Sequence, residues 1–224
     1  MKAAFCLGAG KFELRDMAMP SLNSGEVMLR VEAAGICGSD KWELSQPRVN
    51  SRVAGHEISG VIEAVSGDAD SYSPGMAVVL EPAVSCGQCD ACRGGNFTAC
   101  RRASVIGYGR PGGFAEYLAV PQQNLFPMPP SLSFAEASLA EPTAVAVHGV
   151  GLAGVTGQKC VVFSSSTIGL LVAQVLRERG AEAVWVVDIN ADHLQVASEL
   201  DGIQIVNSAQ DPELRALSNV AADV

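Results

Sequence analysis

Four cysteines crowded into a short stretch constrain this chain more than any other feature of its sequence. Cys86, Cys89, Cys92 and Cys100 are spaced so that one tight knuckle can present three thiolates and the loop that follows can present a fourth. Four thiolates in a tetrahedral arrangement close a structural zinc site and leave no open position for a substrate. The sequence therefore predicts a domain built around a structural zinc ion.

An iron–sulfur cluster and disulfide bonds are the alternatives for this spacing. Bacterial ferredoxins also begin with Cys-x-x-Cys-x-x-Cys, but their fourth cysteine follows sooner and precedes a proline. Here seven residues separate Cys92 from Cys100, and Arg101 comes next. Disulfides are disfavoured because the number of cysteines, 7, is odd and no secretory signal precedes them. Zinc remains the favoured interpretation, and the colour of an iron cluster would distinguish the two metals.

The charge of the chain excludes several classes of partner. A net charge of −9 leaves no basic surface for a phosphate backbone, so we expect no nucleic-acid partner, and a nucleic-acid-binding zinc ribbon is disfavoured. The apolar run at the N-terminus stops at Lys11, too early for a signal peptide. No later stretch reaches the roughly 18 apolar residues of a membrane span. We therefore expect a cytoplasmic protein that does not enter a membrane.

The pattern of strands and helices changes near residue 150. Before it, short strands broken by turn residues predict an all-β or barrel-like domain, with strands over Gly25–Ala34, Gly55–Val65, Met76–Leu80 and Phe114–Val120 and helices over Phe134–Ala140 and Thr143–Leu152. After it, strands alternate with helices, which is typical of a parallel α/β sheet: strand Lys159–Phe163, helix Ile168–Arg179, strand Ala183–Val187, helix Ala191–Leu200 and strand Ile203–Val206. We expect two domains, 1–150 and 151–224.

A second group of metal-ligand residue types is dispersed along the first domain. Cys37 lies in Gly-Ile-Cys-Gly-Ser-Asp, His56 lies between Gly55 and Glu57, and Glu141 precedes a proline. Each alone is weak, because a lone cysteine is usually a core residue and a lone histidine a satisfied polar group. Together they are the thiolate, imidazole and carboxylate that a catalytic zinc needs, with its fourth position left to water or substrate.

With the cysteine cluster, these motifs resemble the zinc-dependent medium-chain dehydrogenases over essentially the whole chain. The matching segments are Gly35 to Asp40, Gly55-His56-Glu57, the four cysteines, Gly112-Gly113-Phe114-Ala115-Glu116-Tyr117 and Glu141-Pro142. The resemblance implies an α/β fold in which a GroES-like catalytic domain containing a β-barrel precedes a Rossmann domain, here only its first half. It also implies two zinc ions per chain. In having glutamate at position 141 the chain resembles the branch of the family that acts on polyols, threonine and sugar alcohols. This resemblance implies a small alcohol or polyol substrate.

The resemblance also implies roles for residues beside the catalytic zinc. Glu57 would bind the zinc's water or exchange with it as a ligand, and Asp40 would hydrogen-bond the outer nitrogen of His56. The zinc would lower the pKa of a bound alcohol so that its alkoxide expels hydride to NAD, while Ser39 passes the proton outward. Many relatives continue that relay with a histidine where this chain has Trp42.

The cofactor segment departs from the family pattern. Ser164-Ser165-Ser166-Thr167-Ile168-Gly169 stands where the family carries Gly-x-Gly-x-x-Gly. Side chains at Ser164 and Ser166 should crowd the pyrophosphate, although backbone N–H groups and hydroxyls remain to bind it, so we expect weakened NAD binding. Asp188, about 20 residues further on, is at the position that accepts the ribose hydroxyls of NAD.

The resemblance finally implies that the chain is truncated, because family members continue past the point that corresponds to Val224. Two functions follow: an NAD-linked polyol dehydrogenase, or a non-catalytic zinc-binding fragment of the same family. The sequence does not specify the oligomeric state, and a homo-oligomer is one possibility.

Overall fold

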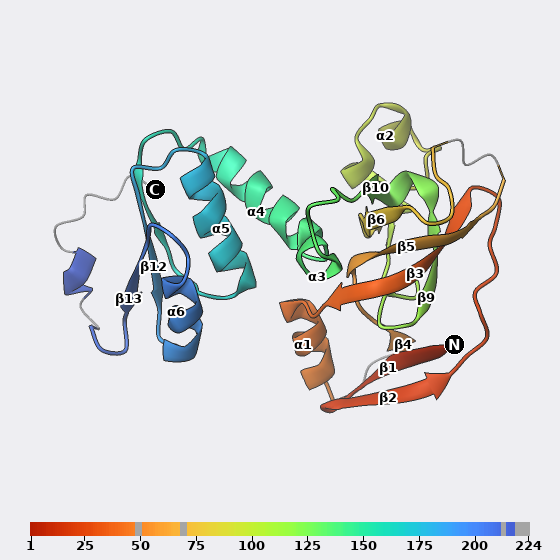
Figure 1. Ribbon diagram of the computed structural model, residues 1–224, viewed down its shortest axis with the longest axis horizontal. Coiled ribbons are helices and arrows are strands. Elements are labelled where there is room, and N and C mark those ends of the chain that lie inside the picture. Colours follow the sequence, from red (N-terminus) through yellow and green to blue (C-terminus); the bar gives the residue numbers. More distant parts are fainter. Residues whose placement is uncertain (48–50, 68–70, 212–213, 218–224) are drawn as a thin grey trace. The chain divides into compact units, whose positions relative to one another are not determined.

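The computed structural model describes residues 1–47, 51–67, 71–211 and 214–217, and the chain divides into two compact units, Met1–Glu141 and Pro142–Val224 (Figure 1). The division falls earlier than the boundary expected near residue 150. It lies in the first turn of helix α4 (Ala140–Ala153), because this helix starts at the end of the first unit and continues without a break into the second.

A five-stranded antiparallel sheet forms the centre of the first unit. Its order is β10-β6-β5-β3-β9, and its strands are β3 (Glu26–Gly35), β5 (Glu57–Val65), β6 (Ala77–Leu80), β9 (Tyr117–Pro121) and β10 (Leu125–Pro127). Val27, Leu29, Ile58 and Ile62 are at most 1% exposed, and they lie two or four residues apart on their strands. This period places them on one face of the sheet, where they form the core of the unit.

Two smaller sheets complete the strands of the first unit. One has the order β2-β1-β4, with β1 (Lys2–Gly8), β2 (Lys11–Asp16) and β4 (Arg52–Val53), and the other pairs β7 (Ala83–Val84) with β8 (Ser104–Val105). The expected barrel was wrong in one respect: among the described residues the strands form separate sheets and do not close. Edge strand β10 spans only three residues and ends in Pro127, which has no N–H with which to continue a ladder.

Two register shifts interrupt the pairing of β3 with β5. Val31 pairs with Gly60 and Ala33 with Ser59, so Glu32 is an extra residue on β3; a similar shift leaves Glu63 extra on β5. Such bulges re-aim the side chains that follow them. Both extra glutamates form ion pairs with Arg30.

The helices of the first unit are short. They are α1 (Gly38–Ser45), α2 (Asp90–Arg93) and α3 (Phe134–Ala137), with single 3₁₀ turns at Phe97–Ala99 and Gln122–Asn124. Helix α1 was not expected from the sequence because it lacks an apolar periodicity. It begins where the Asp40 carboxylate accepts the backbone N–H of Cys37 at 3.0 Å, which satisfies one donor at its start.

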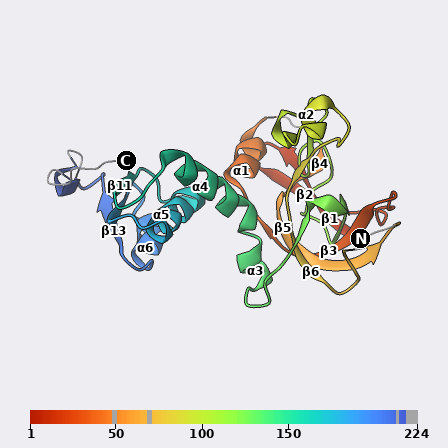
Figure 2. The ribbon, with the colours of Figure 1, turned by 90° about the horizontal axis from the view of Figure 1, so that it is seen from above.

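The second unit has the expected parallel α/β arrangement. Strands β11 (Lys159–Val162), β12 (Ala183–Asp188) and β13 (Ile203–Asn207) lie in that order, the order of the first half of a dinucleotide-binding sheet. Helix α5 (Thr167–Glu178) packs on β11 and β12, and α6 (Ala191–Ser198) on β12 and β13 (Figure 2). A 3₁₀ turn, Arg215–Leu217, follows. The buried residues Cys160, Ala173, Val184 and Val186 form the core between sheet and helices.

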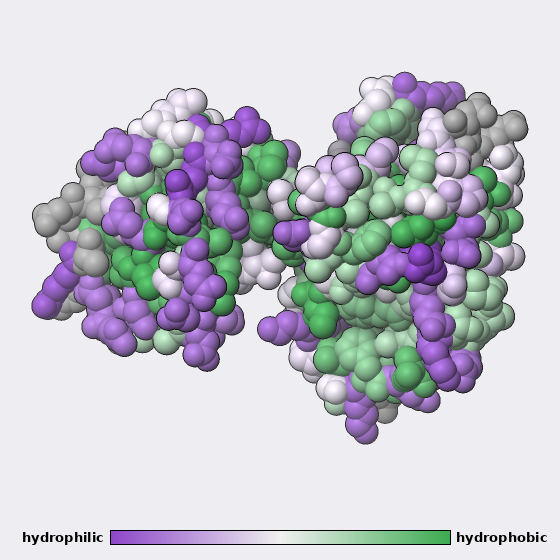
Figure 3. Space-filling model, viewed as in Figure 1, coloured by the Kyte–Doolittle hydropathy of each residue, from purple (hydrophilic) through white to green (hydrophobic). Residues whose placement is uncertain are grey.

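The described helices are too short or too polar for a bilayer span. On the face that Figure 3 shows, hydrophilic side chains cover much of the second unit, whereas the first unit shows broad weakly hydrophobic areas crossed by a band of hydrophilic side chains. Among the described residues, buried apolar side chains form one interior cluster in each unit.

Candidate functional site

Strand pairing brings together a thiol, an imidazole and a carboxylate. Because β3 and β5 are antiparallel with Gly35 opposite Glu57, the residues after β3 lie beside those before β5. One ligand atom each from Cys37, His56 and Glu57 lies within 4.8 Å of the others. These residues are the first two predicted zinc ligands and the glutamate expected beside the metal.

Gly35 makes room for the Glu57 carboxylate. A Cβ at position 35 would lie 2.1 Å from Glu57 Oε2, so only glycine leaves this carboxylate where it is. Burial raises the pKa of Glu57; the charge of His56 lowers it and the charge of Glu141 raises it again. A cation at this place would compensate the cost of holding two carboxylates in a buried region.

The structure places Glu141 near this group but not within it. Glu141 is in the first turn of α4, half-buried, and outside the set of three mutually close ligand atoms. Burial raises its pKa, and the charge of His56 lowers it. Glu141 is therefore a neighbour of His56 and Glu57, and its role as a direct ligand stays a prediction.

Asp40 faces His56 as expected, but the hydrogen bond between them is not formed. The Nδ1 atom of His56 is 3.9 Å from Asp40 Oδ1, beyond hydrogen-bond distance, and the two side chains are 8% and 2% exposed. Neither atom has a hydrogen-bond partner in the described structure. With Nδ1 directed at Asp40, Nε2 is the nitrogen left for a metal. The donor set and this unsatisfied pair fit a zinc ion.

The four cysteines of the cluster converge as the spacing predicts. Their sulfur atoms lie within 4.8 Å of one another, and none forms a disulfide. Cys89 Sγ is 3.5 Å and Cys86 Sγ is 3.9 Å from Cys92 Sγ. Zinc–sulfur bonds of about 2.3 Å at tetrahedral angles place the sulfurs roughly 3.8 Å apart, so the cluster has the dimensions of a four-thiolate zinc site.

Hydrogen-bond donors lower the pKa of Cys86 and Cys89 and so favour their thiolates, whereas burial raises the pKa of Cys92 to about 11. Backbone N–H groups of Gln88 and Cys89 lower the pKa of Cys86 to about 5. Arg102 donates to Cys86 Sγ at 3.4 Å, and the backbone N–H of Cys86 donates to Cys100 Sγ at 3.4 Å. Deprotonated sulfur is the form that binds zinc.

The serine-rich turn lies between β11 and α5, at the place expected for a dinucleotide. Ser164 Oγ donates to Ser166 Oγ at 2.7 Å, and the Ser166 backbone N–H donates to Ser164 Oγ at 3.1 Å. Thr167 and Ile168 begin α5. A Cβ on Gly169 would lie 2.1 Å from the Ser164 carbonyl oxygen, so this glycine permits close helix–strand packing, as the third fingerprint glycine does.

Comparisons with known proteins agree with this geometry. The alcohol dehydrogenase GroES-like domain family matches residues 23–130. L-threonine 3-dehydrogenase of Pectobacterium atrosepticum is 34% identical over 204 residues, covering 88% of this chain and 56% of that protein. Sorbitol dehydrogenase of Bacillus subtilis is 29% identical and is covered to 65%. The structure of galactitol-1-phosphate dehydrogenase from Escherichia coli matches 97% of this chain with a TM-score of 0.87 and 30% identity, and is covered to 64%.

These similarities extend over both units. The chain belongs to the zinc-dependent medium-chain dehydrogenases. Its fold is accordingly that of a GroES-like unit followed by a Rossmann unit. This medium-chain dehydrogenase sequence spans between 56% and 65% of the length of the two curated relatives.

In this dehydrogenase Tyr108 lies beside His56, one of the three proposed metal ligands Cys37, His56 and Glu57, and the sequence did not indicate this. Its ring lies 5.4 Å from the His56 ring, and the guanidinium of Arg52 is 4.9 Å from its centre. Burial raises the pKa of Tyr108, and a hydrogen bond with the Ser39 side chain partly offsets this. Trp42, three residues after Ser39 on α1, is 67% exposed, whereas Tyr108 is the aromatic residue whose side chain hydrogen-bonds with that of Ser39. Tyr108 is far from His56 in the sequence, so only the folded structure shows that the two side chains are neighbours.

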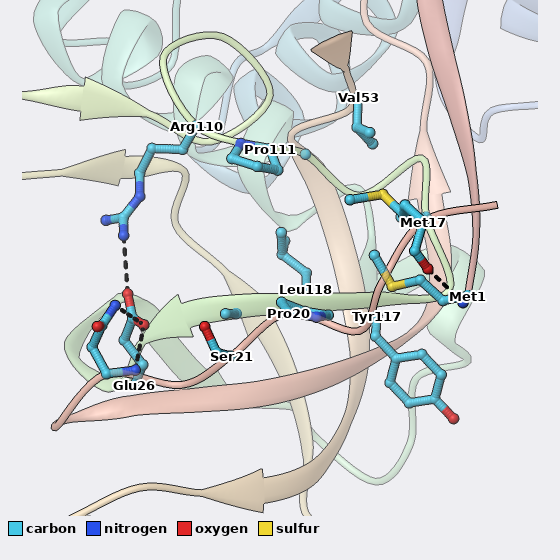
Figure 4. A pocket seen from close by; sticks show the side chains of 14 residues that line it. Met1, Met17, Pro20, Ser21, Glu26, Val53, Arg110, Pro111, Tyr117 and Leu118 are labelled. Atoms are coloured by element: carbon cyan, nitrogen blue, oxygen red, sulfur yellow. Dashed lines mark hydrogen bonds and ion pairs between the residues drawn. The ribbon is translucent and has the colours of Figure 1, made fainter. Parts of the chain in front are cut away.

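A separate pocket lies in the first unit of this medium-chain dehydrogenase, and its lining does not include Cys37, His56 or Glu57. Figure 4 shows Met1, Met17, Pro20 and Leu118 on its apolar wall. At one end Arg110 donates to Glu26 at 3.0 Å, and Asn23 donates to the same carboxylate. Because this ion pair is already satisfied, we assign the pocket no role in the chemistry.

Proposed function

We propose that the protein is a zinc-dependent oxidoreductase that transfers hydride from a polyol or another secondary alcohol to NAD. The observation that carries this proposal is the convergence of Cys37, His56 and Glu57 within 4.8 Å beside the unsatisfied Asp40. The similarity to threonine, sorbitol and galactitol-phosphate dehydrogenases supports the substrate class.

In this proposal Cys37 and His56 hold the catalytic zinc, with Glu57 or Glu141 as the carboxylate ligand, and Cys86, Cys89, Cys92 and Cys100 hold a structural zinc. When bound, the catalytic zinc supplies a Lewis acid that lowers the pKa of an alcohol. Asp40 orients the imidazole of His56. Ser39 takes the alcohol proton, and its hydroxyl is next to that of Tyr108, which offers a route outward in place of the histidine that Trp42 replaces.

The experiment is NAD reduction by the purified chain with sorbitol, galactitol, threonine and a simple diol, before and after zinc is removed with a chelator. We expect NADH formation with at least one polyol, its loss when zinc is removed, and its return when zinc is added back. Activity that survives complete removal of zinc would refute the proposal.

A second candidate is a non-catalytic zinc-binding protein of the same family. Ser164 and Ser166 favour it, because they stand where the family has glycine and bond to each other. Bound zinc without any measurable binding of NAD or NADH would support this candidate over the first.

A further inference from the structure

The carboxylate of Asp188, at the end of β12, is bound by donors of this chain on both oxygens. Oδ2 accepts the backbone N–H of Ser165 at 2.7 Å and the Ser165 hydroxyl at 2.8 Å. Oδ1 accepts the backbone N–H groups of Ile189 at 2.7 Å and Asn190 at 3.0 Å. A carboxylate offers about four lone-pair positions, so these four donors use its ordinary capacity.

These hydrogen bonds lower the pKa of the Asp188 carboxyl. The backbone N–H of Ser165 and then that of Asn190, followed by the Ser165 hydroxyl, lower the pKa of Asp188 to about 2. Hydrogen bonds to a charged acceptor are stronger than those between neutral groups. A ligand that needs the same oxygens must therefore displace one of these donors.

Ser165 supplies the one side chain among the four donors. The three backbone N–H groups are fixed by the turns on either side of the carboxylate. The Ser165 residue is 3% exposed, so its hydroxyl has little access to water as an alternative partner. A fingerprint turn with a residue that has no hydroxyl here would leave one lone pair of Asp188 available.

We infer that Ser165 withholds Asp188 from the vicinal hydroxyls of a ribose, and so sets the affinity of this unit for adenine nucleotides whose 2′- and 3′-hydroxyls are free. This rests on the proposed function only in placing the nucleotide ribose at Asp188. It adds that Ser165 limits the affinity for the nucleotide, alongside Ser164 and Ser166, which stand at the substituted glycine positions.

The test is binding of ADP-ribose to the full chain and to Ser165→Ala, measured by titration calorimetry. Removing the hydroxyl frees one lone pair for a ribose hydroxyl, so we expect binding about tenfold tighter. Ser165→Gly removes the same hydroxyl without adding a methyl group and should behave alike. Ser198→Ala removes an exposed serine hydroxyl that donates to the Gln195 carbonyl on α6, and should leave affinity unchanged.

The outcome of this titration tests the role of Ser165 separately from the proposed zinc and hydride chemistry. Weaker or unchanged binding in both Ser165 variants would overturn it, and so would the absence of measurable binding in wild type and variants alike. A 2′-phosphate cannot donate a hydrogen bond, so we expect the gain to be much smaller for NADP than for NAD. ADP-ribose has no nicotinamide, so a failure of zinc or hydride chemistry leaves this measurement interpretable.

Discussion

The Oδ1 atom of Asp40 lies 3.9 Å from Nδ1 of His56, and both atoms are buried without a hydrogen-bond partner in the described structure. An imidazole that binds a metal through one nitrogen is commonly held by a carboxylate at the other. The pair therefore supports one ligand of the proposed zinc. Its contribution can be measured independently of catalysis.

Replacing this carboxylate should weaken the catalytic zinc site. Asp40→Asn removes the charge that faces His56, and we expect zinc affinity to fall by roughly 10- to 100-fold at one of the two sites. Chelator competition followed by metal analysis measures this. Asp16→Asn changes an exposed aspartate that pairs with Lys2 and serves as the control. Equal zinc retention in both variants would contradict the assigned role.

Loss of one cysteine of the cluster should cost both metal and stability. Cys92→Ser removes a buried thiolate from the proposed structural zinc site, and we expect one zinc per chain to be lost and the free energy of unfolding to fall by at least about 2 kcal/mol. Cys6→Ala is the matched control, because Cys6 is buried in β1 outside both groups of ligands. Zinc content that stays the same in Cys92→Ser would argue against the site.

A methyl group at Gly169 should disturb the turn before α5. The added Cβ would meet the Ser164 carbonyl oxygen at 2.1 Å, and this backbone atom cannot move aside cheaply. We expect Gly169→Ala to destabilise the protein by about 1–3 kcal/mol in thermal or denaturant unfolding. Gly151→Ala, on α4 with nothing within 4 Å of the new Cβ, should have no cost or a small gain. Similar losses in both variants would show that the close approach is unimportant.

Acid should remove the stabilisation that Asp188 provides. The pKa of the folded carboxyl is lowered to about 2 by the Ser165 N–H and the other donors, below its value in the unfolded chain. This contribution is therefore present above about pH 4 and is lost as the pH falls toward about 2. Asp188→Asn should lower the unfolding midpoint at neutral pH and flatten its dependence on pH in that window. Asp201→Asn, at an exposed position, should keep the slope of the wild type.

Much of the fold could be predicted because periodicity reports burial. Apolar residues recur with the period of a strand in β3 and β5, and strand and helix periods alternate from Lys159 to Val206. Each element expected from these periods is present to within a few residues. The β1–β2 hairpin was not predicted: Phe12 and Leu14 alternate with polar residues on β2, but the run is short and its side chains are mostly exposed. Helix α1 likewise depends on the cap formed by Asp40 rather than on an apolar face.

The site was predictable where its residues are close in sequence and less so where they are not. Cys86 to Cys100 form a local motif whose geometry follows from spacing. The neighbourhood of Cys37, His56 and Tyr108 depends on strand register, which a single sequence does not specify. The sequence also assigned Asp188 to a ribose without indicating that Ser165 would occupy it, because a side-chain rotamer decides that contact.

The extra residue Glu32 has a consequence for how this protein can vary. Every position after it on β3, from Ala33 to Gly35, owes the face of the sheet on which it lies to that single insertion. Exchange of Glu32 for another amino acid loses one ion pair with Arg30, whereas its deletion would reverse the faces of the three β3 residues that lead towards Cys37. In this stretch the spacing is under stricter constraint than the chemistry of the side chains.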